Sequence, residues 1–208
     1  MNIIIFGPQG SGKGTQAKIL SDKFNIPNIS TGVIFRGHMK KQTKIGKKIA
    51  TLINDGNLVP DKITNSIIKK RLSRPDTKNG FILDGYPRDL AQAEYLSTIT
   101  NLSFALEIWI SDIVAIERIS QRRICTKCKG IYHLISKPPK NEQLCDICHG
   151  DLIVRQDDKP NAVKKRLNLY HSRTESLIGF YKKQNIFHQI DGEKSITQVT
   201  DEILKIIK

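Results

Sequence analysis

Short apolar runs alternate with amphipathic segments along this chain of 208 residues. After the first run, Ala17, Leu20 and Phe24 recur at helical spacing, and residues 196–206 repeat this pattern near the end. Strands that alternate with helices form parallel βαβ units, so the pattern predicts an α/β fold with one substantial core and a small insertion. Five runs have the length and flanking turn residues of buried strands: 2–6, 28–30, 81–84, 104–110 and 186–190.

A glycine-rich loop follows the first predicted strand at once, with the sequence Gly-Pro-Gln-Gly-Ser-Gly-Lys-Gly-Thr over residues 7–15. The spacing Gly7-x4-Gly12-Lys13 is that of a P-loop, in which backbone N–H groups surround phosphate oxygens and the lysine reaches the β and γ phosphates. A chance glycine-rich turn is the alternative. The strand before the loop and the helical pattern after it favour binding of a nucleoside triphosphate.

A second candidate residue stands at the end of the apolar run over 81–84. Asp84 closes this run, and Gly85 follows directly. A carboxylate that a central strand places beside a phosphate site organises the magnesium ion there. Asp84 is the candidate for that role. The alternative is an aspartate that only caps a turn or helix.

All four cysteines fall into two pairs of identical pattern, Cys125-x2-Cys128 and Cys145-x2-Cys148, each followed by glycine two residues on. Two such pairs separated by sixteen residues predict a tetrahedral thiolate zinc site. With four protein ligands the metal would be structural. Disulfides and free thiols are the alternatives, the choice between zinc and iron stays open, and His133 and His149 are expected to be bystanders.

The formal charge is +14, from 34 basic and 20 acidic side chains. It suits a polyanionic partner, but a lysine-rich solvated surface explains it equally well. The cysteine region between residues 122 and 158 carries seven basic and five acidic side chains, and four thiolates with one zinc bring it near neutrality. This balance argues against nucleic-acid binding. No apolar stretch is long enough to span a membrane, and we expect a cytoplasmic protein.

Several further motifs follow the P-loop in a recognisable order: Ser30-Thr31-Gly32 with Arg36, 55–61, Leu83 to Arg88 with Gln92, Arg118, Arg122-Arg123, Arg155-x-Asp157-Asp158 and Arg166. With these motifs the chain resembles the adenylate kinase family, in its bacterial type with a long zinc-binding lid. The resemblance implies a P-loop NTPase-type three-layer fold with a parallel five-stranded sheet. It also implies a core of residues 1–30, 61–121 and 159–208, a segment that binds the nucleoside monophosphate (NMP) at 31–60, and a lid at 122–158.

The family's activity is ATP + AMP = 2 ADP with magnesium, and arginines suit it because phosphoryl transfer is promoted by alignment and by cations around the equatorial oxygens. The resemblance implies a catalytic group of Lys13, Asp84, Arg88, Arg122, Arg155 and Arg166, and a monomer. For ATP it implies Gly10, Ser11, Gly12, Lys13, Gly14, Thr15, Arg118, Arg122, Ile131, Tyr132 and Lys194. For AMP it implies Thr31, Arg36, Asn57, Leu58, Val59, Gly85, Tyr86, Pro87, Arg88, Gln92, Arg155 and Arg166, with Asp157 and Asp158 as anchors for the lid arginines.

Two positions depart from the family pattern. Val33 stands where an acidic residue is usual, and Asn161 where glutamate is common. Gly14 departs from the general P-loop but not from this family. It occupies the position that often holds a magnesium-binding hydroxyl, so we expect Thr15 and Asp84 to arrange the ion with phosphates and water.

Three other functions remain as alternatives. A sister enzyme, either a GTP-dependent AMP kinase or a UMP/CMP kinase, is the nearest, although Gln92 favours adenine and a zinc lid disfavours the short-lid pyrimidine enzymes. A zinc-ribbon nucleic-acid-binding protein would leave the P-loop and the arginines unexplained. A nucleotide-sensing module would bind without turnover, which the presence of Lys13, Asp84 and Arg88 disfavours.

Overall fold

The computed structural model describes residues 1–207, and its centre is a five-stranded parallel sheet in the order β2-β3-β1-β4-β8. The predicted α/β fold is confirmed, and each strand end lies within one residue of its predicted place. Because β1 is central, its carboxyl end and the loop that follows lie between the ends of β3 and β4. The strands are β1 (Asn2–Phe6), β2 (Asn28–Ser30), β3 (Phe81–Asp84), β4 (Phe104–Trp109) and β8 (Phe187–Asp191).

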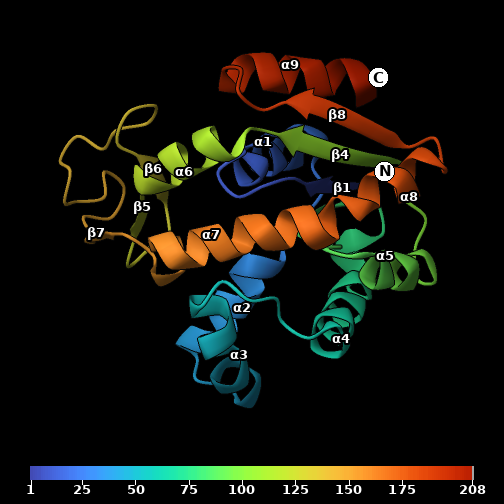
Figure 1. Cartoon of the computed structure of the whole chain (residues 1–208), viewed down its shortest axis with the longest axis horizontal. Helices are drawn as coiled ribbons and strands as arrows, with labels where there is room; N and C mark the ends of the chain where they lie inside the picture. Colours follow the sequence, from blue (N-terminus) through green and yellow to red (C-terminus); the bar gives the residue numbers. More distant parts are fainter. Residues whose placement is uncertain (208) are drawn as a thin grey trace.

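Helices cover both faces of this sheet and give three layers (Figure 1). On one face, Ile3 and Ile5 pack against α1 (Lys13–Phe24) and α9 (Ile196–Ile207). On the other face, Ile4 and Phe6 belong to the cluster formed with α4 (Asp61–Leu72), α5 (Leu90–Ser97) and α8 (Ser176–Lys182). Successive side chains of a strand point to opposite faces, so the unbroken apolar run of β1 serves both layers.

Two helices project from the sheet after β2. They are α2 (Thr31–Lys40) and α3 (Lys44–Asn54), and Figure 1 shows them on one side of the molecule, apart from the sheet. We call residues 31–60 the α2–α3 arm. Phe35, Ile49 and Val59 form its own small apolar cluster. The arm is therefore packed internally as well as joined to the sheet.

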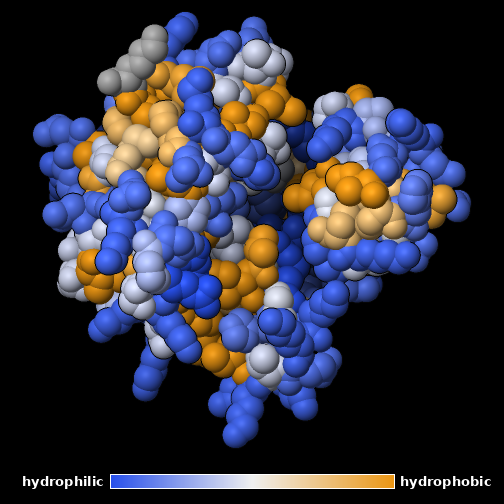
Figure 2. Space-filling view, turned by 180° about the vertical axis from the view of Figure 1, so that it is seen from behind, coloured by the Kyte–Doolittle hydropathy of each residue, from blue (hydrophilic) through white to orange (hydrophobic). Residues whose placement is uncertain are grey.

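A second projection lies between α6 (Asp112–Ser120) and α7 (Pro160–Leu169). Here β5 (Arg122–Cys125), β6 (Ile131–His133) and β7 (Leu152–Ile153) form an antiparallel sheet in the order β6-β5-β7, followed by a 3-10 turn at Gln156–Asp158. Figure 2 shows a lobe separated from the body by a hollow lined mainly with hydrophilic residues. The buried interior of this 122–158 segment is formed by Cys125, Tyr132 and Cys145. This interior is too small to hold the segment together by apolar packing.

The remaining elements connect these parts. A 3-10 turn at Pro75–Thr77 precedes β3, and a π-helical stretch at Tyr170–Thr174 joins α7 to α8. Among residues 1–207, no helix has both the length and the apolar character needed to cross a membrane.

Candidate active site

The loop after β1 has the backbone shape that its glycines predict. Gly7 has a φ of 136°, and a Cβ there would lie 2.2 Å from the carbonyl oxygen of Ile108, so no other residue fits. The loop leads into the amino end of α1, which begins at Lys13. Backbone N–H groups at a helix amino terminus attract anions, so the loop and this terminus together form a phosphate site.

The Lys13 amine is enclosed by this loop. It donates to the carbonyl oxygen of Pro8 at 2.6 Å and lies 3.3 Å from the Ser11 hydroxyl. Removal from solvent lowers the pKa of Lys13 to about 7; the nearby Asp84 carboxylate opposes this shift, and neighbouring arginines, Arg88 first among them, add to it. The site therefore has an excess of positive charge that an anionic ligand would relieve.

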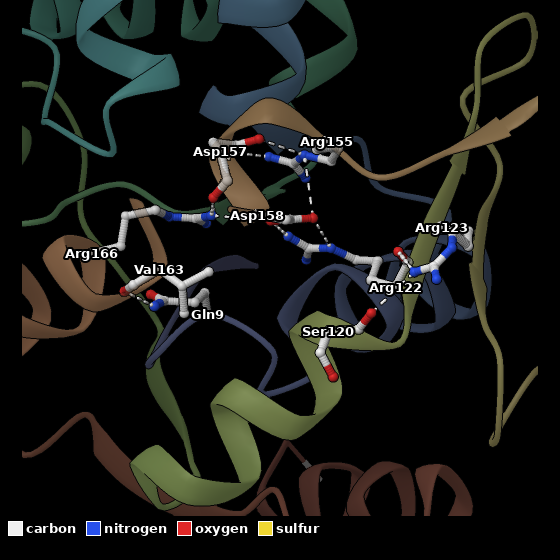
Figure 3. Close-up of polar contacts among 9 residues, drawn as sticks. All are labelled: Gln9, Ser120, Arg122, Arg123, Arg155, Asp157, Asp158, Val163 and Arg166. Atoms are coloured by element: carbon white, nitrogen blue, oxygen red, sulfur yellow. Dashed lines mark hydrogen bonds and ion pairs between the residues drawn. The ribbon is translucent and has the colours of Figure 1, made fainter. Parts of the chain in front are cut away.

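Three arginines and two aspartates form a connected ionic cluster beside the loop (Figure 3). Arg122 binds both carboxylate oxygens of Asp158, with Nε to Oδ2 at 2.8 Å, and Arg155 binds Asp157 in the same way. Arg166 of α7 donates to the Asp157 carbonyl oxygen at 2.9 Å and lies 3.4 Å from both carboxylates. The expectation that Asp157 and Asp158 contact these arginines agrees with this geometry.

Burial shapes the charges of this cluster. It lowers the pKa of Arg166 to about 10. Burial also disfavours the ionised form of Asp157, but the adjacent Arg155 outweighs it and holds the pKa of that carboxyl at about 2. With three cations and two anions, the cluster keeps one positive charge in excess beside Lys13.

Two pockets adjoin at this cluster. The first lies between the α2–α3 arm and the sheet, and the second lies against the P-loop, with Gln9 and Lys13 in its wall. Arg88, Arg166, Gly85, Leu58 and Gly56 line both pockets. Of the residues expected at AMP, the first pocket collects Thr31, Arg36, Asn57, Leu58, Val59, Gly85, Arg88, Gln92, Arg155 and Arg166.

Two other residues expected at AMP are placed differently. Pro87 lines only the pocket beside the P-loop. Tyr86 lines neither pocket, and its buried hydroxyl donates to Asn65 Oδ1 at 2.7 Å and lies 3.2 Å from the Gln92 carbonyl oxygen. The Tyr86 side chain thus holds the carboxyl end of β3 to α4 and α5.

Four residues expected at ATP lie apart from the arginine cluster. Arg118 donates to the carbonyl oxygens of Gly192 and Glu193, and the Lys194 amine binds Glu202 at 2.9 Å. Ile131 is half exposed on the 122–158 segment. The Tyr132 side chain is buried, and its hydroxyl accepts from the Asp146 N–H at 3.0 Å and lies 3.3 Å from Cys145 Sγ, so it belongs to the cysteine region.

Asp84 and Thr15, the two residues expected to arrange magnesium, both lie at the amino end of α1. Asp84 ends β3, opposite Ile5 in the register of β1, and its Oδ2 would lie 3.7 Å from a Cβ at Gly14. It therefore faces the amino end of α1, where Thr15 also stands.

Some contacts at the site have no signal in the sequence. Gln9 of the P-loop donates from Nε2 to the Val163 carbonyl oxygen of α7 at 2.8 Å, which joins the loop to the helix that follows the 122–158 segment (Figure 3). Thr174 donates to the Arg88 carbonyl oxygen at 2.9 Å. Both contacts join residues far apart in the chain, and neither lies within a recognisable motif.

The four cysteines come together as predicted. Their Sγ atoms all lie within 4.8 Å of one another, with Cys125 and Cys148 at 3.4 Å and Cys128 and Cys145 at 3.5 Å. The two Cys-x-x-Cys-x-Gly turns are alike in hydrogen bonding, since Cys125 N–H and Cys145 N–H each donate at 2.9 Å to the carbonyl oxygen of the glycine five residues on.

The two neighbouring histidines are not part of the cysteine cluster. His133 Nδ1 accepts from the backbone N–H groups of Ile135 and Ser136, and among residues 1–207 the four thiols are the group with metal-binding geometry.

A P-loop at the centre of a parallel sheet, with a second pocket across a cluster of arginines, is the arrangement of a P-loop phosphotransferase. A family model described as adenylate kinase matches residues 5–186. A protein named adenylate kinase from Acetivibrio thermocellus is 45% identical over 212 residues, covering 100% of this chain and 98% of the relative. Relatives of the same name from Caldicellulosiruptor saccharolyticus (46% identical, 100% and 99% covered) and Thermosipho melanesiensis (45% identical, 100% of both covered) agree.

The chain belongs to the adenylate kinase family. It is a nucleoside monophosphate kinase, and its family carries out reversible phosphoryl transfer between adenine nucleotides with Mg²⁺ and ATP.

Proposed function

We propose that the chain converts ATP and AMP into two ADP by direct transfer of the γ-phosphoryl group between two nucleotides held in adjoining pockets. The observation that carries this proposal is that the P-loop pocket and the arm pocket share Arg88 and Arg166. A phosphoryl group that leaves one pocket therefore enters the other beside the guanidinium groups of Arg88 and Arg166. One chain builds both pockets, which supports a monomer as the active unit.

On the donor side, the P-loop amides and Lys13 hold the ATP phosphates, with Arg122 from the 122–158 segment. Arg118, Lys194 and the exposed face around Ile131 hold the adenosine. The contact of Arg118 with residues 192–193 supports this assignment, because it brings α6 beside the loop that carries Lys194.

On the acceptor side, Arg36 and Arg88 hold the AMP phosphate, and Thr31, residues 57–59 and Gln92 enclose the base. An oxygen of the AMP phosphate attacks the γ-phosphorus, and the bond between that phosphorus and the bridging oxygen of ADP breaks. No general base is needed, since the attacking phosphate is already anionic. Arg122, Arg155 and Arg166 stabilise the charge on the transferring group.

The division of the chain explains how water is kept out. We infer a core of residues 1–30, 61–121 and 159–208, an NMP-binding arm at 31–60 and a lid at 122–158. Arg122 and Arg155 stand near the two ends of the lid, so lid movement brings them to the phosphates or removes them. Closure with both nucleotides bound places the reaction in a dry site and prevents transfer to water.

Magnesium fits the donor site through few protein ligands. Asp84 supplies the carboxylate near the amino end of α1, and Thr15 supplies a hydroxyl in its first turn. Mg²⁺ neutralises phosphate charge when bound, and it keeps several waters in sites of this kind. Asp84 and Thr15 orient those waters and the phosphates.

Zinc fits the four cysteines of the lid. In a tetrahedral site with Zn–S bonds of about 2.3 Å, sulfur atoms lie about 3.8 Å apart. The Sγ atoms found within 4.8 Å of one another, with pairs at 3.4 and 3.5 Å, need only small shifts to match this geometry. The Tyr132 hydroxyl, 3.3 Å from Cys145 Sγ, lowers the pKa of that thiol and favours its thiolate form. The backbone N–H of Gly130 favours the thiolate of Cys128, but the neighbouring thiols outweigh it and raise the pKa of Cys128, as expected where several thiolates would crowd together without a cation.

Removal of zinc is expected to lower the thermal midpoint by about 10 °C or more, because the lid has almost no apolar interior to replace the metal. Turnover measured well below the midpoint should change little, since no zinc ligand lines either pocket. Metal content and thermal unfolding, with and without a strong chelator, check this. A metal-free protein as heat-stable as the loaded one contradicts a structural zinc.

Binding of ATP is expected to be coupled to proton uptake by Lys13. The free site holds its pKa at about 7, below the ordinary 10.5, and adjacent phosphates return it upward. At pH 7 about half a proton should be taken up, close to one at pH 8.5, and none below about pH 5, where Lys13 is already protonated. Calorimetric titrations in buffers of different ionisation enthalpy, compared with Lys13→Met to correct for protons released by ATP itself, measure it. Equal uptake by both proteins contradicts the assignment.

The test of the proposed function is nucleoside diphosphate formation by purified protein with magnesium and either ATP or GTP, offered AMP, GMP, CMP, UMP or no monophosphate. Turnover with AMP alone is expected. Turnover with UMP or CMP would assign the chain to a pyrimidine kinase, and turnover of AMP with GTP preferred over ATP would assign it to the GTP-dependent class.

A further inference from the structure

The amide of Gln92 is held from both sides in the arm pocket. Its Oε1 accepts from the backbone N–H of Arg88 at 2.9 Å, and its Nε2 donates to Asp61 Oδ1 at 2.6 Å. The side chain is buried, with 2% exposed, and lines the pocket with Thr31 and Val59. Asp61, the first residue of α4, closes the motif at 55–61, and the resemblance assigned it no role.

These two contacts determine which end of the amide is oxygen. A backbone N–H only donates, and a carboxylate only accepts, so oxygen must face Arg88 and nitrogen must face Asp61. In the reverse orientation the amide nitrogen would face the Arg88 N–H, donor against donor, and the amide oxygen would face the Asp61 carboxylate, acceptor against acceptor. Each of these unmatched pairs is costly in a buried place. The orientation therefore follows from chemistry as well as from the coordinates.

The main chain of Gln92 is held as well. Its N–H donates at 3.0 Å to Asp89, which caps α5, and its carbonyl oxygen lies 3.2 Å from the Tyr86 hydroxyl. With backbone and amide both held, Gln92 has little freedom to adapt to a different base. One oxygen lone pair and one N–H of the amide remain without a partner among residues 1–207.

The free donor and acceptor match adenine and mismatch a 6-oxopurine. On its N1 edge, adenine presents its 6-amino group as donor next to the unprotonated ring nitrogen N1 as acceptor. Hypoxanthine and guanine present oxygen at position 6 and a protonated N1, which reverses the pattern. An amide that is free to rotate by half a turn would accept both kinds of base. An amide whose orientation is fixed accepts only one of them.

We infer that Asp61 is a specificity-determining positioning residue, whose carboxylate locks the Gln92 amide in the orientation that reads adenine and rejects 6-oxopurine monophosphates. The inference rests on the proposed function, since it concerns base selection in the AMP pocket. Asp61 acts only through Gln92, and it should leave the ATP site unaffected.

The test compares AMP with inosine monophosphate, which differs from AMP only at position 6 and N1. In Asp61→Asn the asparagine amide can either accept or donate, so residue 61 no longer requires the Gln92 nitrogen to face it. The contact with the Arg88 N–H remains. The ratio of kcat/KM for AMP to that for inosine monophosphate is expected to fall by about ten- to a hundredfold, the factor that one unmatched buried group supplies. The KM for ATP should not change. Asp22→Asn, on the exposed face of α1, is the matched control and should keep the wild-type ratio.

Other variants separate this role from a structural one. Asp61→Ala removes the acceptor altogether and should lower the ratio in the same way. In a Gln92→Ala background, Asp61→Asn should leave the ratio unchanged, because the amide it acts on is gone. An unchanged ratio in both Asp61 single variants, or equal losses with both monophosphates, overturns the inference while leaving the proposed function standing. Failure of the unmodified protein to use AMP overturns both.

Discussion

Replacement of Lys13 by methionine is expected to lower ADP formation from ATP and AMP by about a thousandfold. Methionine keeps the length and apolar stem of lysine but removes the cation that the P-loop encloses. The loss should appear mainly in kcat, because the charge on the transferring phosphoryl group grows toward the transition state. Initial rates at saturating magnesium–ATP and AMP measure the effect.

The matched control is Lys18→Met on the same helix. Lys18 is exposed and, within residues 1–207, forms an ion pair with Asp22 alone, so its loss should leave the rate near that of the wild type. A thermal melt of each variant shows whether lost activity reflects lost structure. Near-normal turnover by a folded Lys13→Met would remove the P-loop lysine from the mechanism.

Replacement of Asp158 by asparagine is expected to lower the free energy of unfolding by ~3–5 kcal/mol. The Asp158 side chain is fully buried. Its carboxylate accepts from Nε and Nη2 of Arg122, and its Oδ1 lies 3.4 Å from Nη1 of Arg166. Asparagine keeps the shape but leaves three partly buried arginines with one carboxylate. Urea unfolding at pH 7 measures the change.

The control for this variant is Asp76→Asn. Asp76 also forms a two-bond pair, with Arg71, but it lies at the surface and half of its side chain is exposed. Solvent screening makes such pairs weak, so the control should unfold much like the wild type. Added ATP and AMP should stabilise Asp158→Asn more than the wild type, since their phosphates replace the missing negative charge. Equal destabilisation by the two variants would contradict a special role for the buried cluster.

The strands and the P-loop could be predicted because their signals are local. The run Ile3 to Phe6 is apolar without interruption, as a central strand buried on both faces must be, and Gly7 can be only glycine where the backbone meets Ile108. The cysteine pairs are equally local, because each Cys-x-x-Cys-x-Gly turn folds on its own few residues.

The positions of other site residues depended on contacts that no sequence window contains. Arg118 and Arg122 lie four residues apart, yet one reaches the loop at 192–193 and the other the buried Asp158. The burial of the Tyr132 side chain among the cysteines likewise depends on contacts made by the folded 122–158 segment. The contacts of Gln9 with α7 and of Asp61 with Gln92 join distant segments through single hydrogen bonds, which leave no periodic pattern.

Transfer of label from the γ position of ATP tests the central claim most directly. ATP labelled with ³²P at the γ-phosphate is mixed with magnesium, AMP and the purified protein, and the products are separated at early times. The label should appear in the β-phosphate of newly formed ADP, with almost none in inorganic phosphate. Label found mainly in inorganic phosphate, whether or not AMP is present, would contradict direct transfer between two adjoining nucleotide pockets.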